Sequence, residues 1–281
     1  MNTIKKKIDK ALSGRFCPSE LDYVRKAICV ELLGVSEFSY YTGEKVSLSH
    51  NMEARLNDAL ERLSTGEPLQ YVIGTVPMCG LSFQVDRRVL IPRPETAELV
   101  EWVVSDLKGC KEGRLLDIGT GSGCIAVTLS HMFPKWKIEG WDISGDALEL
   151  AESNNRLNCT GVTFRKVDIL GDIDSLDGFR YDVIVSNPPY IAESESSGME
   201  HTVLDYEPYS ALFVPDDDPL LFYRAIADSG RGLLSQGGSL YFEINPLYAD
   251  ELLPMLRFKG YDKAELRNDI SGKPRFVKCK F

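Results

Sequence analysis

The sequence predicts an α/β protein that begins with a small helical bundle, and three observations lead to this fold class. In the N-terminal part, apolar residues recur at helical spacing, and two short apolar runs separated by residues 77–80 then predict a β-hairpin. Beyond Pro94, strand-like apolar runs alternate with amphipathic helical ones. This alternation indicates an open, mostly parallel sheet with helices on both faces.

Two amphipathic helices are expected before the hairpin. The first spans residues 20–33, with Ser19 as its N-cap and Gly34 at its end, and the second spans residues 51–63 and is followed by Gly66. Their apolar residues fall on one face of each helix, which predicts the core of a bundle. The expected hairpin strands are residues 71–74 and 81–85, and we expect this hairpin to join two domains.

Seven strands are expected in the second part of the chain, at residues 114–118, 137–142, 162–167, 181–186, 238–244, 262–268 and 275–280. Amphipathic helices are expected at residues 95–107, 146–157 and 220–234. In open sheets of this type, ligands bind at the carboxyl ends of the strands, near the point where the strand order reverses. Polar residues at several predicted strand ends should therefore share one crevice.

A glycine-rich turn follows the first of these strands, in the run from Asp117 to Gly123. Its glycines allow positive φ and close approach of a ligand to the backbone. The next strand ends in Asp142, at a spacing that suits the hydroxyl pair of a ribose. A nicotinamide or flavin dinucleotide is the alternative, but Cys124 stands where that fingerprint requires its third glycine. The spacing instead resembles the S-adenosylmethionine site of class I methyltransferases.

An Asn-Pro-Pro-Tyr turn, Asn187 to Tyr190, follows the apolar strand at residues 181–186. The side-chain oxygen of Asn187 and the carbonyl oxygen of Pro188 are both acceptors, and the prolines fix the turn. Tyr190 offers a flat ring that can stack on a planar group. Two acceptors directed at one NH2 group suit the methylation of an amide or an aromatic amine. A proline-rich strand end without a ligand is the alternative interpretation.

The composition of the 281-residue chain is that of a globular protein, with 43% hydrophobic and 26% charged residues. No apolar run approaches the roughly 20 residues that span a bilayer, and the N-terminus lacks the apolar stretch of a signal peptide. The seven cysteines are scattered, which predicts reduced thiols and a cytoplasmic location. The three histidines lie far apart, so no metal site is expected.

The net charge of −10 is unevenly distributed along the chain. Residues 1–90 contain 12 basic and 11 acidic residues, so the remaining part carries a net charge of −11. Because binding to duplex nucleic acid depends largely on neutralising phosphates, this acidic part argues against stable nucleic-acid binding. It suits a basic protein partner better.

Over nearly its whole length the chain resembles the glutamine methyltransferases that modify peptide chain release factors. The resemblance is carried by the segment from Leu90 to Thr96, Leu-Ile-Pro-Arg-Pro-Glu-Thr, together with the glycine loop and the Asn-Pro-Pro-Tyr turn. It implies a helical substrate-docking domain at 1–68, a hairpin linker at 69–92 and a class I methyltransferase domain with a seven-stranded sheet at 93–281. The implied cofactor is S-adenosylmethionine, and the implied protein substrate is a release factor, methylated on the glutamine of its Gly-Gly-Gln loop.

The resemblance also implies a role for individual residues. The implied cofactor-binding residues are Asp117, Gly119, Thr120, Gly121, Ser122, Gly123, Asp142, Asp168, Ile169 and Asn187. The implied catalytic residues are Asn187, Pro188 and Tyr190, and the implied substrate-binding residues are Arg93, Asn187, Pro188, Pro189 and Tyr190. Two alternatives stay open: an amino-methyltransferase of a nucleic-acid base, which shares the Asn-Pro-Pro-Tyr motif, and a non-catalytic adaptor that binds S-adenosylmethionine.

Overall fold

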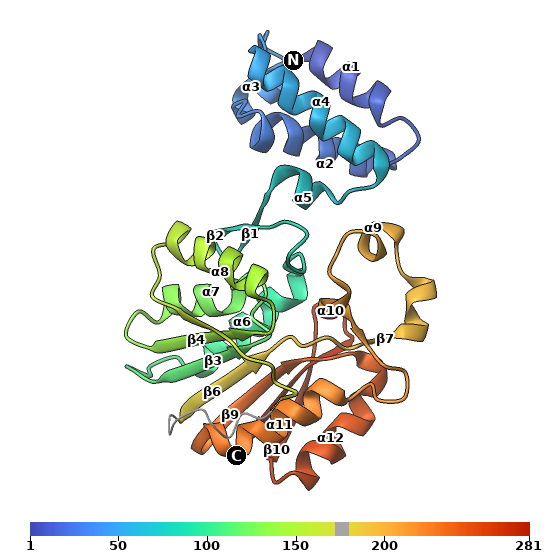
Figure 1. The fold of residues 1–281 in the computed structure, drawn as a ribbon. Coiled ribbons are helices and arrows are strands. Elements are labelled where there is room, and N and C mark those ends of the chain that lie inside the picture. The colour runs from blue at the N-terminus through green and yellow to red at the C-terminus, as the bar shows by residue number, and fades with distance from the viewer. Residues whose placement is uncertain (172–179) are drawn as a thin grey trace. The chain divides into compact units, whose positions relative to one another are not determined.

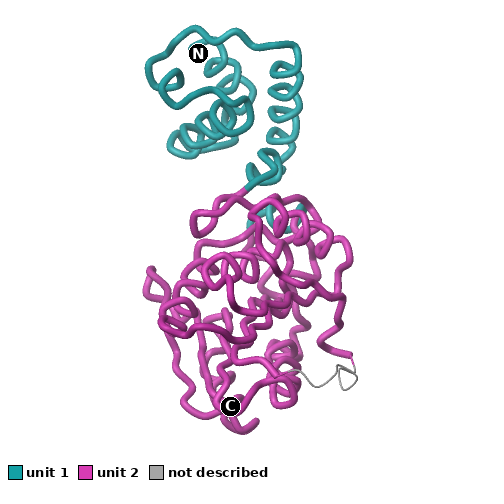
Figure 2. Tube along the Cα trace, turned by 90° about the vertical axis from the view of Figure 1, so that its left-hand side faces the viewer, with its two compact units in different colours: residues 1–75, 200–206 teal, residues 76–199, 207–281 magenta. Residues whose placement is uncertain are grey.

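The computed structural model describes residues 1–171 and 180–281, which form two compact units (Figure 2). One unit comprises Met1–Thr75 and Glu200–Tyr206, and the other comprises Val76–Met199 and Glu207–Phe281. The domain boundaries implied by the family resemblance stay predictions.

The first unit is helical, as the apolar spacing predicts. It contains α1 (Asn2–Ala11), α2 (Pro18–Ala27), a π-helical turn (Ile28–Leu32), α3 (Glu37–Thr42), α4 (His50–Thr65), α5 (Leu69–Ile73) and α9 (His201–Leu204). Inward-facing residues such as Ile8, Ile28 and Leu56 are fully buried in one cluster. The predicted end of α4 is confirmed, because Gly66 adopts a φ of +99° there, a conformation that glycine takes without strain.

Two local predictions in this region are wrong. The helix predicted from residue 20 begins at Pro18, with Cys17 rather than Ser19 at the N-cap, because proline is favoured in the first helical turn. Residues 71–74, predicted as a strand, belong to α5 and its cap Gly74. A short apolar run does not separate strand from helix by periodicity, and here Tyr71 and Val72 are buried as helical residues.

The hairpin is present, but its first strand starts later than predicted. It consists of β1 (Thr75–Met78) and β2 (Leu81–Gln84). Cys79 and Gly80 both have positive φ, the conformation that a two-residue hairpin turn requires.

The second unit contains a seven-stranded sheet, and the predicted architecture is confirmed (Figure 1). The strand order is β10-β11-β9-β6-β3-β4-β5. The described strands of this sheet all run in one direction except β11, which is antiparallel to β10 and to β9. The strands are β3 (Arg114–Ile118), β4 (Lys137–Asp142), β5 (Thr163–Lys166), β6 (Tyr181–Ser186), β9 (Leu234–Glu243), β10 (Asp262–Asn268) and β11 (Pro274–Lys280).

Helices cover both faces of this sheet (Figure 1). The helices are α6 (Pro94–Asp106), α7 (Cys124–Met132), α8 (Gly145–Leu157), α11 (Leu221–Leu233) and α12 (Ala249–Phe258). Because successive strand residues point to opposite faces, Leu115 packs in the cluster of α6 and α7, whereas Leu116 packs in that of α11 and α12.

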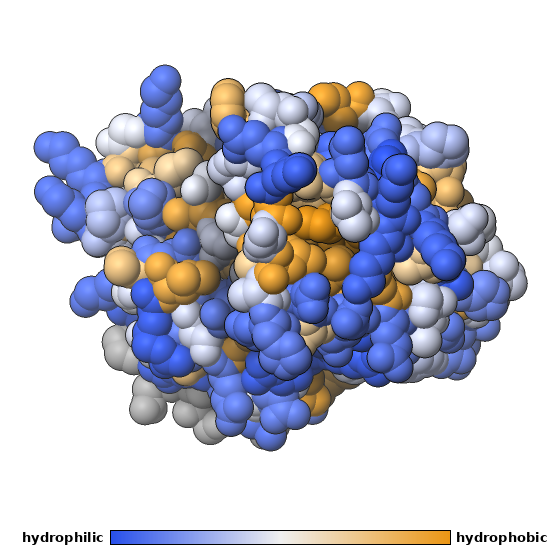
Figure 3. Space-filling view, turned by 90° about the horizontal axis from the view of Figure 1, so that it is seen from above, coloured by the Kyte–Doolittle hydropathy of each residue, from blue (hydrophilic) through white to orange (hydrophobic). Residues whose placement is uncertain are grey.

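Short elements complete the second unit. They are β7 (Ile191–Ala192), which pairs in parallel with β8 (Phe213–Val214), the helix α10 (Tyr209–Leu212) and two 3-10 turns (Glu193–Gly198 and Pro246–Tyr248). Within residues 1–171 and 180–281, no helix is both long and apolar enough to cross a membrane. In the view from above, hydrophobic residues lie exposed among hydrophilic ones (Figure 3).

Candidate active site

The glycine loop and the Asn-Pro-Pro-Tyr turn lie side by side. They follow β3 and β6, which are neighbours in the sheet, and the Ser186 hydroxyl donates a hydrogen bond of 2.6 Å to the carbonyl oxygen of Ile118. A methyl group placed on Gly119 would lie 4.0 Å from the Asn187 carbonyl oxygen. The chain leaves β3 toward β4 on one side and returns to β6 on the other, so the strand order reverses at this point.

A cavity of about 500 Å³ opens at this reversal point, entirely within the second unit. It is large enough for a cofactor-sized molecule. Of the residues that the sequence singles out, the lining includes Arg93, Gly119, Thr120, Gly121, Ser122, Asp142, Asp168, Ile169, Asn187, Pro188 and Pro189. Three predicted site residues, Asp117, Gly123 and Tyr190, lie outside the lining.

The backbone holds the glycine loop in place. Gly119 and Thr120 both donate their N–H groups to the carbonyl oxygen of Trp141 at the end of β4. Gly119, Gly121 and Gly123 have φ values of +72°, +52° and +78°, which other residues adopt only with strain. The space beside Gly121 is open, whereas a methyl group on Gly123 would meet Ala151 and Phe164 at 3.1 Å. Gly123 therefore serves packing, and Gly121 leaves room at the cavity.

Asp117 is fully buried behind the loop. Its Oδ2 accepts hydrogen bonds from the Thr120 hydroxyl at 2.6 Å and from the Ala126 N–H at 3.2 Å. Its Oδ1 is buried and has no hydrogen-bond partner within the described parts of the chain. Burial raises the pKa of this carboxyl to about 7, against the lowering effect of those two bonds. An unpartnered carboxylate oxygen at this place favours a positively charged ligand.

Asp142 ends β4 and faces the same cavity. Its Oδ2 accepts the Gly121 N–H at 2.8 Å, and its Oδ1 accepts the Ser144 N–H at 2.9 Å. Ser144 in turn caps α8. Burial raises the pKa of the Asp142 carboxyl, and these backbone bonds lower it. Because a carboxylate has about four lone-pair sites, Asp142 retains capacity to accept the hydroxyl groups of a ligand.

Asp168 and Ile169 line the cavity beyond β5. The Asp168 side chain accepts the Leu170 N–H at 2.9 Å, which fixes the turn. Ile169 is half-buried against the core cluster of α11 and α12, so it presents an apolar surface at this end of the cavity.

A chain of hydrogen bonds leads from Asn187 into the protein interior. The Asn187 Nδ2 donates to the Thr96 hydroxyl at 3.2 Å, and the Thr96 hydroxyl donates to Oε2 of Glu243 at 2.8 Å. The Tyr190 hydroxyl donates to the other carboxylate oxygen of Glu243 at 3.1 Å. Tyr190 therefore points its hydroxyl group into the interior. The sequence prediction did not assign a role to Thr96 or Glu243.

Glu243 lies at the end of β9 and is only 1% exposed. Burial raises the pKa of its carboxyl to about 7, while the bonds from Thr96 and Tyr190 and the charge of Arg275 lower it. Burial and the nearby Glu243 also raise the pKa of the Tyr190 phenol, so this hydroxyl stays protonated and remains a donor. A lone acid in the apolar run from Leu240 to Ile244 is the sequence signal that points to such a group.

Arg93 lines the cavity and is held by Glu207. The guanidinium group forms an ion pair with Oε1 of Glu207, whose other oxygen accepts the Ile91 N–H at 3.0 Å. The Glu207 side chain is buried, so this pairing fixes the segment that precedes α6.

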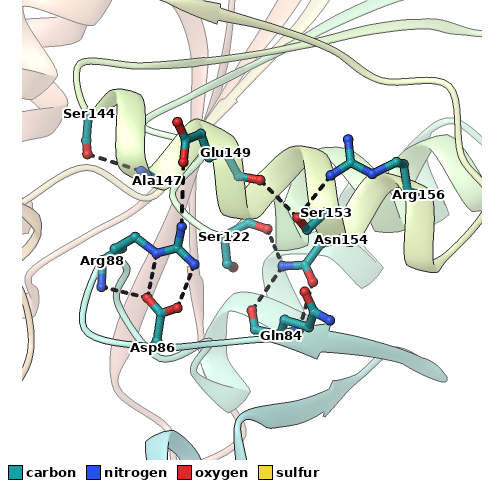
Figure 4. Close-up of polar contacts among 10 residues, drawn as sticks. All are labelled: Gln84, Asp86, Arg88, Ser122, Ser144, Ala147, Glu149, Ser153, Asn154 and Arg156. Carbon is teal, nitrogen blue, oxygen red and sulfur yellow. Dashed lines mark hydrogen bonds and ion pairs between the residues drawn. The ribbon is translucent and has the colours of Figure 1, made fainter.

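The buried Asn154 of α8 ties the hairpin to the glycine loop (Figure 4). Its Nδ2 donates to the carbonyl oxygens of Gln84 and Ser122 at 3.0 and 2.9 Å, and its Oδ1 accepts the Gln84 N–H at 2.7 Å. Arg88, which is among the cavity-lining residues, pairs with Asp86 beside it. The Asn154 side chain thus fixes both the strand β2 and the loop that lines the cavity.

Among the described residues, no group of three or more His, Cys, Asp or Glu side chains has an arrangement that can hold a metal ion.

Known proteins resemble this chain in sequence and in fold. Residues 97–204 match the family model of the Methyltransferase small domain, and residues 25–74 match that of the PrmC N-terminal domain. A release factor glutamine methyltransferase of Bacteroides thetaiotaomicron is 45% identical over 277 residues, which cover 99% of each chain. One of Lactococcus lactis is 36% identical over 265 residues, or 94% of each chain.

The chain belongs to the release factor glutamine methyltransferase family. Its fold is also shared by a 16S rRNA methyltransferase of T. thermophilus that was solved with AdoMet and guanosine. That similarity has a TM-score of 0.54 at 16% identity, covers 73% of this chain and 49% of the other, and concerns the fold alone.

The family implies the use of S-adenosylmethionine, and the cavity fits this cofactor. The orphaned oxygen of Asp117 suits the positive charges of the methionine part, and Asp142 has free acceptor sites for a ribose. Ile169 offers an apolar contact for a base.

Proposed function

We propose that this member of the family methylates the side-chain amide nitrogen of the glutamine in the Gly-Gly-Gln loop of a peptide chain release factor. The proposal rests mainly on one observation: the Asn187 turn borders the same cavity as the glycine loop and Asp142. A methyl acceptor at Asn187 is thereby next to a cofactor at the loop. The names of relatives that cover almost the whole chain support the same substrate.

Each cavity residue has a proposed task. Gly119 to Ser122 hold the methionine part of the cofactor, Asp142 the ribose, and Asp168 and Ile169 the adenine. Asp117 and Gly123 act from behind the loop, one by charge and the other by packing. When bound, S-adenosylmethionine supplies an electrophilic methyl group on its sulfonium sulfur.

The chemical problem is that a carboxamide nitrogen is a poor nucleophile, because its lone pair is delocalised onto the carbonyl. In the proposed mechanism, the Asn187 side-chain oxygen and the Pro188 carbonyl oxygen accept hydrogen bonds from the two N–H groups of the glutamine amide. These fixed acceptors stabilise the positive charge that develops on the nitrogen. Holding the nitrogen in line makes the reaction effectively unimolecular, an effect that reaches about 7–11 kcal/mol in favourable cases. The proton that leaves the nitrogen passes to water.

Pro189, Tyr190 and Arg93 complete the proposed substrate site in different ways. Pro189 and Arg93 line the cavity directly. The Tyr190 hydroxyl is bonded to Glu243, so Tyr190 contributes its ring and the rigidity of the turn.

The helical unit is the proposed docking element for the release factor. Tyr23, Phe38 and Tyr41 belong to this unit and are each at least 60% exposed, and aromatic residues of this kind are enriched at protein interfaces. Binding energy from such remote contacts orients the reacting group, so a short glutamine peptide should lose turnover as well as affinity. A release factor acts in translation termination, which is consistent with the predicted cytoplasmic location.

An incubation with radiolabelled S-adenosylmethionine tests the proposal. The purified protein is mixed with a release factor and total RNA in one tube, and the label is followed in the protein and nucleic-acid fractions. Label in the release factor is the expected result. Label in the nucleic acid, with steep salt dependence, would instead favour the base methyltransferase, and label in neither would favour the non-catalytic adaptor.

A further inference from the structure

We propose that Thr96 and Glu243 are positioning residues that set the orientation of the Asn187 amide, so that its oxygen and not its NH2 group meets the substrate. This inference rests on the proposed function and deepens it. Neither residue needs to touch the glutamine, because both act through Asn187.

The geometry places the three side chains in an unbroken line. Thr96 is at the start of α6, Glu243 ends β9, and Asn187 follows β6. The distances are 3.2 Å from Asn187 Nδ2 to Thr96 Oγ1 and 2.8 Å from Thr96 Oγ1 to Glu243 Oε2. Thr96 is 3% exposed and Glu243 is 1% exposed, so water does not compete with the bond between them, whereas the bond from Asn187 is part-buried at the cavity.

The direction of each hydrogen bond follows from the chemistry of Glu243. An ionised carboxylate accepts hydrogen bonds and donates none. It therefore takes the proton of the Thr96 hydroxyl on one oxygen and that of the Tyr190 hydroxyl on the other. With its proton used, the Thr96 oxygen can only accept, and its partner on Asn187 must be the NH2 group. The Asn187 oxygen is then left for the cavity.

This order matters because the two ends of an asparagine amide have nearly the same shape. An amide turned by half a rotation fits the same space but presents donors to the glutamine, which itself presents donors. In that orientation the site repels the reacting NH2 group instead of accepting its protons. A threonine that only anchored α6 to β9 would not distinguish the two orientations.

The test compares two substitutions at Thr96. Thr96→Val keeps the shape and removes the hydroxyl, whereas Thr96→Ser keeps the hydroxyl. We expect kcat to fall at least about tenfold in Thr96→Val, because the NH2 group of Asn187 loses its buried acceptor and the amide then presents its oxygen to the substrate only a small part of the time. The KM for the release factor and the Kd for S-adenosylmethionine should stay within about threefold, because most of both contacts lie elsewhere. Thr96→Ser should recover kcat.

Thr128→Val is the matched control. Thr128 lies on α7, is fully buried, and its hydroxyl has no hydrogen-bond partner within residues 1–171 and 180–281. This variant makes the same chemical change in the interior, and kcat should be unchanged. An equal loss of kcat in Thr96→Val and Thr128→Val, or no recovery in Thr96→Ser, would mean that Thr96 is only structural.

Glu243→Gln provides a second variant. Glutamine brings an NH2 group that donates to Thr96 or to Tyr190, which reverses one part of the hydrogen-bond order. We expect the same loss of kcat with cofactor affinity retained. The NH2 group can also turn to Tyr190 and leave the bond to Thr96 intact, so Glu243→Leu, which removes both acceptor oxygens, decides the point. Wild-type kcat in Glu243→Leu would overturn the inference.

A measurement on the unmodified protein decides the matter if these variants do not fold. In a nuclear Overhauser spectrum of the 15N-labelled protein, the side-chain NH2 protons of Asn187 should show cross-peaks to the Thr96 side chain. Their absence would overturn the inference. A wild-type protein that never methylates a release factor would instead contradict the proposed function, whatever these cross-peaks show.

Discussion

The loop after β3 and the turn after β6 lie at the same edge of the sheet, but they are held in different ways. Backbone groups hold the glycine loop, through two N–H hydrogen bonds to the carbonyl oxygen of Trp141 and three positive φ angles. Buried side chains hold the Asn187 turn, through Thr96 and Glu243. A backbone-built loop can approach a cofactor closely, whereas a side-chain-built turn can fix which atom meets a substrate.

Beside each of the two elements lies one buried carboxyl with a pKa raised to about 7, Asp117 in β3 before the loop and Glu243 at the end of β9 behind the turn. Asp117 has one oxygen without a partner in the described chain, whereas both oxygens of Glu243 accept bonds. The first carboxyl is therefore suited to act on a ligand by its charge from behind the loop, and the second to holding a neighbouring side chain.

Asn187→Ala is expected to have the largest effect. Removing one fixed polar group from a transition-state site costs roughly 10²–10³ in kcat. Cofactor affinity should fall far less, because the glycine loop and Asp142 are untouched. Methyl transfer to a release factor and calorimetry of S-adenosylmethionine binding measure the two quantities. Near-native turnover in a folded Asn187→Ala variant would contradict the assignment of catalysis to the turn and of cofactor binding to the loop.

Asp142→Ala should show the opposite pattern. Losing hydrogen bonds to a charged group costs roughly 1.5–3 kcal/mol, which corresponds to a tenfold or greater weakening of S-adenosylmethionine binding. At saturating cofactor, kcat should change less than in Asn187→Ala. Unchanged affinity, measured by calorimetry on a variant with a native circular dichroism spectrum, would refute the ribose assignment.

The pH dependence of turnover distinguishes the two carboxyls. The proposed hydrogen-bond order needs ionised Glu243, so kcat at saturating cofactor should fall as pH is lowered through about 7, by roughly tenfold one pH unit below the pKa. The groups that act on this pKa are Thr96, Tyr190, Arg275 and Glu95. Glu243→Gln should be less active and lose this limb of the profile. A limb that persists in Glu243→Gln would belong to Asp117 instead.

The same carboxyl should affect stability in the opposite direction. Because its pKa is higher in the folded than in the unfolded protein, the folded state binds more protons between about pH 4 and 7. Its contribution to stability therefore decreases as pH rises through that range. In urea unfolding, Glu243→Gln should gain stability relative to wild type between pH 5 and pH 8. A difference that does not change with pH would show that Glu243 titrates normally.

Asn154→Ala is expected to have the smallest effect on turnover, because Asn154 supports the glycine loop from outside the cavity. Asn154→Ala leaves the buried Ser122 carbonyl oxygen without this partner and should cost about 1–3 kcal/mol of unfolding free energy. Asn158→Ala is the matched control, since Asn158 makes similar bonds to Ser82 of the same hairpin strand but at a more exposed position. Its cost should stay below about 1 kcal/mol. Equal costs would mean that the bond to Ser122 contributes nothing.

Much of this site can be predicted from the sequence because its motifs are contiguous. The glycine loop, Asp142 and the Asn187 turn each occupy a short segment at the end of an apolar strand, and a parallel sheet brings such ends together. The central strands such as β3 and β6 were predictable for the same reason, since buried strands are apolar runs, whereas β5 and β10 are mostly exposed and carry a weaker signal. The strand at residues 71–74 was mispredicted because a four-residue apolar run fits a helix equally well.

The contact between Thr96 and Glu243 could not be predicted in this way. The two residues are 147 positions apart in the sequence, and only the packing of α6 on β9 brings them together. Tyr190 shows the same limit, because its position in the motif does not reveal that its hydroxyl group points to Glu243 and away from the cavity.

Tandem mass spectrometry of a release factor, after incubation with this protein and S-adenosylmethionine, shows whether the glutamine of the Gly-Gly-Gln loop is the methyl acceptor. We expect one added methyl group, on the side-chain nitrogen of that glutamine, and none in a parallel incubation with Asn187→Ala. A methyl group on another residue, or an unmodified loop with a fully folded and cofactor-loaded protein, would contradict this expectation.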